Sequence, residues 1–111
     1  MAKELKFVIL LDCYGELLTD KQRDYMELYY CEDLSLSEIS EPQGITRQAV
    51  RDVIKRSEQI LLETEKKLGL AEKISAVRDC LEKLKSVSAE CSDKQISSAM
   101  NKYIDKCLEL I

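Results

Sequence analysis

The side chains best suited to chemistry in this sequence are a group of cations and polar residues between positions 46 and 56. The members of the group are Thr46, Arg47, Gln48, Arg51, Lys55 and Arg56. The segment holds four cations against one anion, Asp52, although the 111-residue chain has a formal net charge of -4. Arg and Lys bind phosphate groups, and Arg and Gln also form paired hydrogen bonds with base edges. The group is therefore a candidate nucleic-acid-binding surface, with an ordinary solvated helix face as the alternative.

The spacing within this group favours one face of a helix. Arg47, Arg51 and Lys55 are four residues apart, so they lie along one line of a helix. Thr46 can cap that helix and meet a phosphate at its N-terminus. The sequence has no basic arm or tail, so any contact with nucleic acid comes from this face and weakens early as salt rises.

Residues for catalysis are lacking elsewhere. The chain has no histidine, which is the commonest general base and metal ligand. It also contains neither a G-x-x-x-x-G-K-[ST] nor a G-x-G-x-x-G phosphate-binding motif. The five cysteines show no C-x-x-C spacing and stand at positions 13, 31, 80, 91 and 107. We predict that the protein is not an enzyme and uses no cofactor or metal.

Cysteine usage and hydropathy together predict a cytoplasmic protein. Scattered free cysteines behave as small buried apolar residues and indicate a reducing compartment. The apolar run at residues 7–11 is far too short to span a membrane and lacks a small-residue cleavage site. We expect no membrane insertion.

Two helices joined by a tight turn position the basic group. Ser35 and Glu38 form a capping box that starts the first helix. Pro42 limits this helix to a few residues, and Gly44 provides a left-handed turn. Thr46 caps the second helix, whose buried face consists of Val50, Val53, Ile54, Ile60 and Leu61. This pattern is typical of a helix-turn-helix, whose second helix enters the major groove of DNA.

The remaining sequence also predicts helices. One covers residues 3–18, and another begins at the Thr19 and Gln22 capping box and ends near residue 30. The recognition helix continues to residue 68, before Gly69. Helices at residues 71–87 and 94–110 form an antiparallel hairpin, with Ser92 and Gln95 capping the second of them. We predict an all-α helix-turn-helix bundle without a winged helix, formed by residues 1–69. Residues 70–111 are predicted to form a C-terminal helical hairpin that serves as a packing or partner extension.

Several short motifs between about positions 5 and 70 resemble those of a known bacterial family. They are Leu18-Thr19-Asp20-Lys21-Gln22, Leu28-Tyr29-Tyr30, and Arg47-Gln48-Ala49-Val50 followed by Ile54-Lys55-Arg56. They are similar to the YlxM family, small proteins of Gram-positive and related bacteria encoded beside signal recognition particle genes. The resemblance implies a fold like the promoter-reading C-terminal region (region 4) of sigma factors, and a regulatory part in the signal recognition particle pathway.

The sequence departs from the pattern of this family near the turn. Ser40 stands where the family has Ala, and Pro42 and Gln43 replace a Glu followed by a large apolar residue. Looser packing beneath the turn is therefore expected. Arg51 stands where the family often has tyrosine, which adds a charge that could contact phosphate or guanine.

Two functions are compatible with these features. The first is a DNA-binding regulatory protein of the signal recognition particle pathway. The second is an adaptor that binds the particle's GTPase, its receptor or its RNA without sequence-specific DNA binding, and the acidic net charge favours it.

Surplus apolar residues predict a homodimer. Residues 7–11 and 60–62 are consecutive apolar runs, so each run extends around more of its helix than one small core can cover. The two-fold axis is expected near the first helix, the second half of the long helix or the C-terminal hairpin. The alternative is a monomer whose hairpin folds back over both runs.

Overall fold

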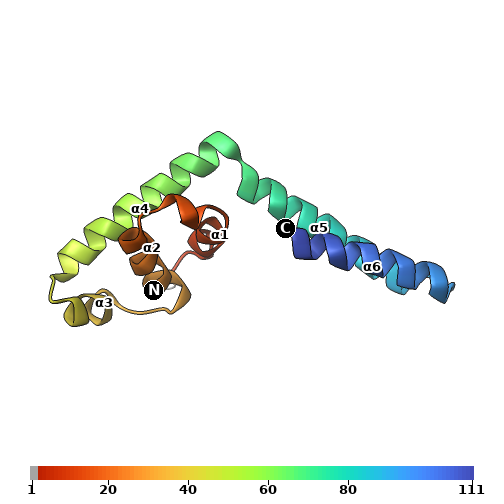
Figure 1. Cartoon of the computed structure of the whole chain (residues 1–111), viewed down its shortest axis with the longest axis horizontal. Coiled ribbons are helices and arrows are strands. Elements are labelled where there is room, and N and C mark those ends of the chain that lie inside the picture. The colour runs from red at the N-terminus through yellow and green to blue at the C-terminus, as the bar shows by residue number, and fades with distance from the viewer. Residues whose placement is uncertain (1–2) are drawn as a thin grey trace. The chain divides into compact units, whose positions relative to one another are not determined.

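The computed structural model describes residues 3–111, and within that range the chain forms helices and turns without any strand. The predicted all-α class is confirmed. The chain divides into two compact units, one up to Ala71 and one from Glu72 onward. Figure 1 labels the helices along the chain. No helix in the described range is both long and apolar enough to cross a membrane.

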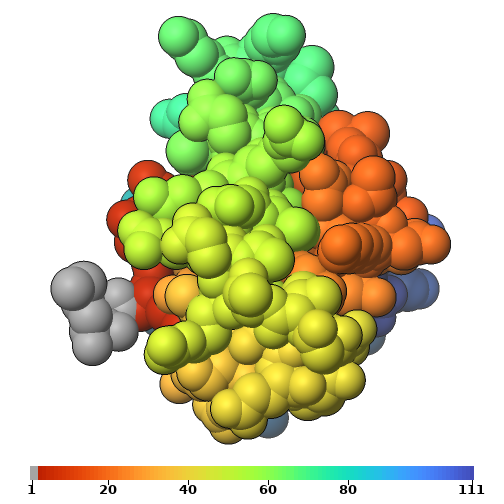
Figure 2. All heavy atoms as spheres, turned by 90° about the vertical axis from the view of Figure 1, so that its left-hand side faces the viewer, coloured from red at the N-terminus to blue at the C-terminus, as the bar shows by residue number. Residues whose placement is uncertain are grey.

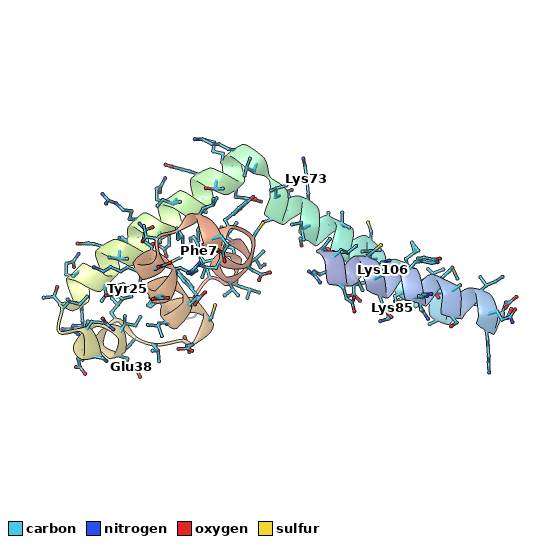
Figure 3. All side chains as sticks on the ribbon, viewed as in Figure 1. Phe7, Tyr25, Glu38, Lys73, Lys85 and Lys106 are labelled. Atoms are coloured by element: carbon cyan, nitrogen blue, oxygen red, sulfur yellow. The ribbon has the colours of Figure 1, made fainter. Side chains whose placement is uncertain are left out.

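The first unit packs four α-helices around one core. In chain order they are α1 (Leu5–Tyr14), α2 (Asp20–Met26), α3 (Leu36–Gln43) and α4 (Arg47–Leu68). Phe7 and Tyr25 lie among these helices, whereas Glu38 lies on α3 at the edge (Figure 3). The core consists of Phe7, Leu10, Leu11, Tyr14, Leu18, Tyr25, Met26, Ile39, Val50, Ile54, Leu61 and Ala71.

Two short helical turns extend the first helices. The prediction that the first helix continues to residue 18 is wrong, because α1 ends at Tyr14 and a 3-10 turn, η1 (Gly15–Leu17), follows. After α2 the chain widens into a π-helical turn, η2 (Glu27–Cys31), in which the Glu32 N–H donates to the Glu27 carbonyl over 3.0 Å. The sequence pattern did not indicate this turn.

Both predicted capping boxes are present. The Thr19 side chain accepts a hydrogen bond from the Gln22 N–H, and the Gln22 side chain accepts one from the Thr19 N–H. Ser35 and Glu38 repeat this reciprocal pattern at the start of α3, over 3.0 and 3.1 Å. Each box satisfies backbone donors that a helix N-terminus leaves without a partner, so sequence alone fixes these two starts.

The turn between α3 and α4 is closed by backbone hydrogen bonds. Gly44 has a φ of 67°, as predicted, and its N–H donates to the Glu41 carbonyl over 3.2 Å. The Ile45 N–H reaches back to the Ser40 carbonyl over 3.3 Å, which completes a Schellman motif. The expectation that Pro42 shortens α3 is wrong. The proline lies exposed in the last turn, where it removes only one intrahelical donor.

Two residues beneath this turn are buried, and the expected looser packing around Pro42 and Gln43 stays a prediction. Ile39 and Ser40 are each 2% exposed. The Ser40 hydroxyl donates to the Ser37 carbonyl over 3.3 Å, so the buried oxygen has a partner within its own helix.

The second unit is an antiparallel hairpin of α5 (Leu70–Ala89) and α6 (Lys94–Leu110). The hydroxyls of Ser88 and Ser97 donate to each other's backbone carbonyls over 3.2 and 2.9 Å. The bounds predicted for α6 are confirmed, but its cap is not Ser92. Instead, the Asp93 carboxylate accepts hydrogen bonds from the N–H groups of Gln95 and Ile96 over 3.0 and 3.2 Å.

The cysteines are free thiols in both units, as expected. The prediction that they are buried apolar residues is wrong for Cys31, Cys80 and Cys107, which are exposed. Cys13 and Cys91 are half-buried.

Candidate nucleic-acid interface

The N-terminus of α4 is capped by the side chain of Thr46. The Thr46 hydroxyl oxygen accepts a hydrogen bond from the Ala49 N–H over 3.1 Å, which leaves the hydroxyl proton able to donate outward. No acidic residue lies in the first turn of this 22-residue helix. The partial positive charge of the helix end therefore faces solvent, as a phosphate-binding site requires.

All six predicted contact residues are exposed on α4 or at its cap. In Figure 2 the turn and the first half of α4, in yellow and yellow-green, lie on the surface toward the viewer. Among residues 3–111, no ion pair involves any of the four cations Arg47, Arg51, Lys55 and Arg56. Their charges are therefore available to an anionic ligand without breaking an internal pair.

The structure groups some of these residues more closely than others. At about 100° per residue, Arg47, Arg51 and Lys55 follow one line along α4, about 6 Å apart along its axis. Arg56 lies about 100° around the helix from Lys55, so it flanks this line rather than extending it. The Gln48 amide donates to the Asp52 carboxylate over 2.8 Å, so a base contact by Gln48 requires this bond to rearrange.

The buried side of α4 fixes the helix to the core. Val50 and Leu61 are fully buried and Ile54 is 4% exposed. Ser57 is also fully buried, and its hydroxyl donates to the Val53 carbonyl over 2.7 Å. Because these side chains are buried in the core, the helix and its basic residues are held in one orientation.

Two tyrosines hold α4 at further points. Tyr30 of η2 donates its hydroxyl proton to the Glu58 carboxylate, and burial together with this bond raises the pKa of Tyr30 above 10.0. Tyr14 of α1 donates to Glu65 over 2.6 Å, and burial followed by this bond likewise raises the pKa of Tyr14. The Glu65 carboxylate also accepts the Ala71 N–H over 3.1 Å. At about 100° per residue, Glu58 and Glu65 continue the helical line of Arg47, but each carboxylate is held by a tyrosine hydroxyl.

An acidic groove borders the turn in the same unit. It has a volume of about 610 Å³, and its lining is Lys21, Asp24, Tyr25, Glu27, Leu28, Glu32, Gln43 and Ile45. Three carboxylates against one ammonium repel phosphate, so the candidate nucleic-acid surface does not extend into this groove. Sequence reasoning missed the groove and the two tyrosine contacts, because their residues come from segments that no helical periodicity connects.

Within the described residues, no cluster of His, Cys, Asp and Glu could hold a metal ion.

Comparisons with known proteins agree with this geometry. The sequence model of the family UPF0122, described as "Putative helix-turn-helix protein, YlxM / p13 like", matches residues 1–108. A UPF0122 protein of Shouchella clausii is 44% identical over 108 residues, covering 97% of this chain and 96% of its own. One from Halalkalibacterium halodurans is 48% identical over 96 residues, or 86% and 84% of the two chains. One from Desulforamulus reducens is 56% identical over 70 residues, and the match spans 63% of this chain and 60% of that protein. This is a family of helix-turn-helix proteins and not an enzyme family, and the chain belongs to it: it is a member of the UPF0122, or YlxM-like, family.

Proposed function

We propose that this chain is a cytoplasmic DNA-binding regulatory protein that binds nucleic acid through the first half of α4 and acts in the signal recognition particle pathway. One observation carries the binding proposal. Four exposed cations, which form no ion pair with any residue of the range 3–111, lie beside a capped helix N-terminus in a chain whose net charge is -4. The link to the particle comes from the family resemblance. Residues 1–69 are the binding domain in this proposal, and residues 70–111 a packing extension.

The roles of the six residues follow from their positions. Thr46 and the N-terminus of α4 hold one phosphate. Arg47, Arg51 and Lys55 follow the groove, where Arg51 is placed to contact phosphate or the edge of a guanine. Gln48 reads a base after releasing Asp52, and Arg56 contacts the backbone at the flank.

A homodimer suits this function. Two recognition helices about 34 Å apart enter successive major grooves, so that two weak half-sites make one usable site.

A second candidate function rests on the acidic groove beside the turn. Its lining combines three carboxylates with the largely apolar side chains of Tyr25, Leu28 and Ile45. Such a groove fits a basic segment of a protein partner, and here the partner is the particle's GTPase or receptor. In this function the protein is an adaptor, or contacts the particle's RNA without reading DNA sequence.

Titration of fluorescent DNA duplexes and of the particle's RNA, each at two salt concentrations, separates the two functions. Nanomolar binding that depends on DNA sequence supports the regulator, since specific complexes typically have dissociation constants of about 10⁻⁸ to 10⁻¹¹ M. The adaptor is supported if modest salt abolishes the binding of either nucleic acid and if the protein also captures the purified GTPase or receptor.

A further inference from the structure

The C-terminal hairpin leaves most of its apolar side chains in solvent. Of the large apolar residues from position 72 to 111, only Ile104 is buried, at 4% exposure. The exposed ones are Val77, Leu84, Val87, Ile96, Tyr103, Leu110 and Ile111. Two helices that bury so little between them resemble half of a bundle rather than a complete core.

The exposed apolar residues gather on one side of the hairpin. The Ser88–Ser97 hydrogen bonds and the Lys85–Asp105 ion pair of 3.0 Å fix which side of each helix faces the other. Successive residues of a helix are rotated by about 100° around its axis. One apolar stripe of α5 and one of α6 therefore fall on the same side of the hairpin, away from the ion pair. We call this side the hairpin face. Its residues are Val77, Cys80, Leu84 and Val87 of α5 and Ile96, Met100, Tyr103, Cys107 and Leu110 of α6.

The pattern on the hairpin face is that of a helix-packing seam. Both stripes alternate steps of three and four residues, which is the spacing of side chains at the contacts of coiled coils and four-helix bundles. The face also contains a hollow of about 260 Å³ without a charged side chain, lined by Ala76, Val77, Cys80, Leu81 and Leu84. Tyr103, which is 65% exposed, protrudes beside this hollow. A surface that has both a hollow and protruding side chains can be complementary to the same surface of a second copy.

The size of the face agrees with a dimer contact. Helices of about 25 Å length lying 8–10 Å apart present a side of roughly 500 Å² in projection. That is in the upper part of the range of about 300–600 Å² for the largest apolar patch of a typical monomer, and such patches are often functional. It is somewhat smaller than the roughly 800 Å² of accessible surface that each partner contributes to a standard interface.

Charge favours a second copy over a charged partner. From Glu72 onward the chain carries seven Lys and Arg against seven Asp and Glu, so the hairpin has no net charge. Two hairpins therefore meet without net repulsion, and neither acidic nor basic partners are selected by long-range attraction.

We infer that the hairpin face pairs with the same face of a second copy, so that two hairpins make a four-helix bundle. The inference deepens the homodimer of the proposed function by assigning its interface to α5 and α6. It excludes α1 and the second half of α4 as the principal contact.

Sedimentation equilibrium of the full chain at micromolar concentration tests the interface. The unmodified chain is expected to have twice the mass of one 12.8 kDa chain. Leu84→Lys combined with Tyr103→Lys places charges on the hairpin face and should give a monomer. Ser75→Lys combined with Ser98→Lys adds the same charge at exposed positions on the other side and should leave the dimer intact. An unmodified chain that is monomeric at every concentration, or a dimer that persists in the first variant, overturns the inference.

Native cysteines provide a second test that does not depend on the lysine variants folding. Cys80 and Cys107 lie on the hairpin face, whereas exposed Cys31 lies in the first unit. Chains that keep only Cys80, or only Cys107, should form cross-linked dimers with a short bismaleimide, and chains that keep only Cys31 should not. Efficient cross-linking through Cys31 alone contradicts the assigned interface. Neither test uses nucleic acid. If the chain forms this dimer but binds no DNA, the proposed DNA-binding function is wrong and the assigned interface is still supported.

Discussion

Gly44 shows how one residue determines the geometry of the basic helix. Its φ of 67° turns the chain between α3 and α4, and the space where a Cβ would lie is empty within 4 Å. A side chain at position 44 would therefore lower the stability of the fold through backbone strain rather than through a steric clash. The glycine and the two capping residues around it, Ser35 and Thr46, were predictable from sequence because each acts through bonds within a few residues.

Replacing Gly44 with Val should destabilise the protein by more than about 1 kcal/mol, because a branched side chain is strained at positive φ. Thermal unfolding followed by circular dichroism measures the effect. Gly15→Ala is the control, since Gly15 has a φ of -54° and an added Cβ meets Arg23 and Leu11 only at ordinary contact distances. Equal melting temperatures for Gly44→Val and the unmodified chain would contradict the role of the turn.

Tyr14 and Tyr30 make a prediction about pH. Their pKa values are raised above 10.0, so folding favours the neutral phenol. This part of the stability is fully present below about pH 10, the ordinary tyrosine value, and is lost as the pH rises further. Urea unfolding at pH 8 and pH 11 should show a larger loss for the unmodified chain than for Tyr14→Phe combined with Tyr30→Phe. The raised pKa values of Lys85 and Cys31 act in both chains and cancel. Because a hydrogen bond with Tyr14 affects the pKa of Cys13, both chains carry Cys13→Ser in this comparison. Equal losses would show that the two phenols do not stabilise the fold through Glu65 and Glu58.

At the scale of elements, local signals predicted most helix starts, and tertiary contacts decided the rest. The bounds of α6, Lys94–Leu110, were predictable because its apolar spacing is regular and the link before it is polar. The π-helical turn η2 was not, because Tyr29 and Tyr30 are placed by contacts with Lys3, Phe7 and Glu58 from distant parts of the chain. Pro42 was misjudged because a helix end tolerates the missing donor.

The cap of α6 gives a matched pair of substitutions. Asp93→Ala should cost about 1 kcal/mol, because it removes the acceptor for two N–H groups at the start of the helix. Ser92→Ala should be close to neutral, because the hydroxyl of the neighbouring serine does not cap the helix. Thermal unfolding of the two variants compares them directly. A larger loss for Ser92→Ala would reverse the assignment.

At the scale of the whole molecule, charge is divided between surfaces. The first half of α4 is basic, the groove beside the turn is acidic and the hairpin is neutral overall. The six candidate contacts were found from sequence because they fall within eleven consecutive residues at the start of one helix, where Arg47, Arg51 and Lys55 share a line. The groove, the pairing of Gln48 with Asp52 and the tyrosine contacts of Glu58 and Glu65 depend on packing between elements, which the sequence pattern alone does not show.

The central claim, that the basic line of α4 binds nucleic acid, is tested most directly by the salt dependence of DNA binding. Phosphate contacts do not depend on sequence, so fluorescence anisotropy with any labelled duplex over a range of salt concentrations reports them. Arg47→Ala combined with Arg51→Ala should weaken binding and reduce the slope of log K against log salt by about 0.9 for each lost contact, or nearly 2 in total. Lys66→Ala combined with Lys67→Ala removes the same charge from the exposed far end of α4 and should leave the slope unchanged. An unmodified chain that does not bind DNA at low salt, or equal slopes for the two double variants, would contradict the claim.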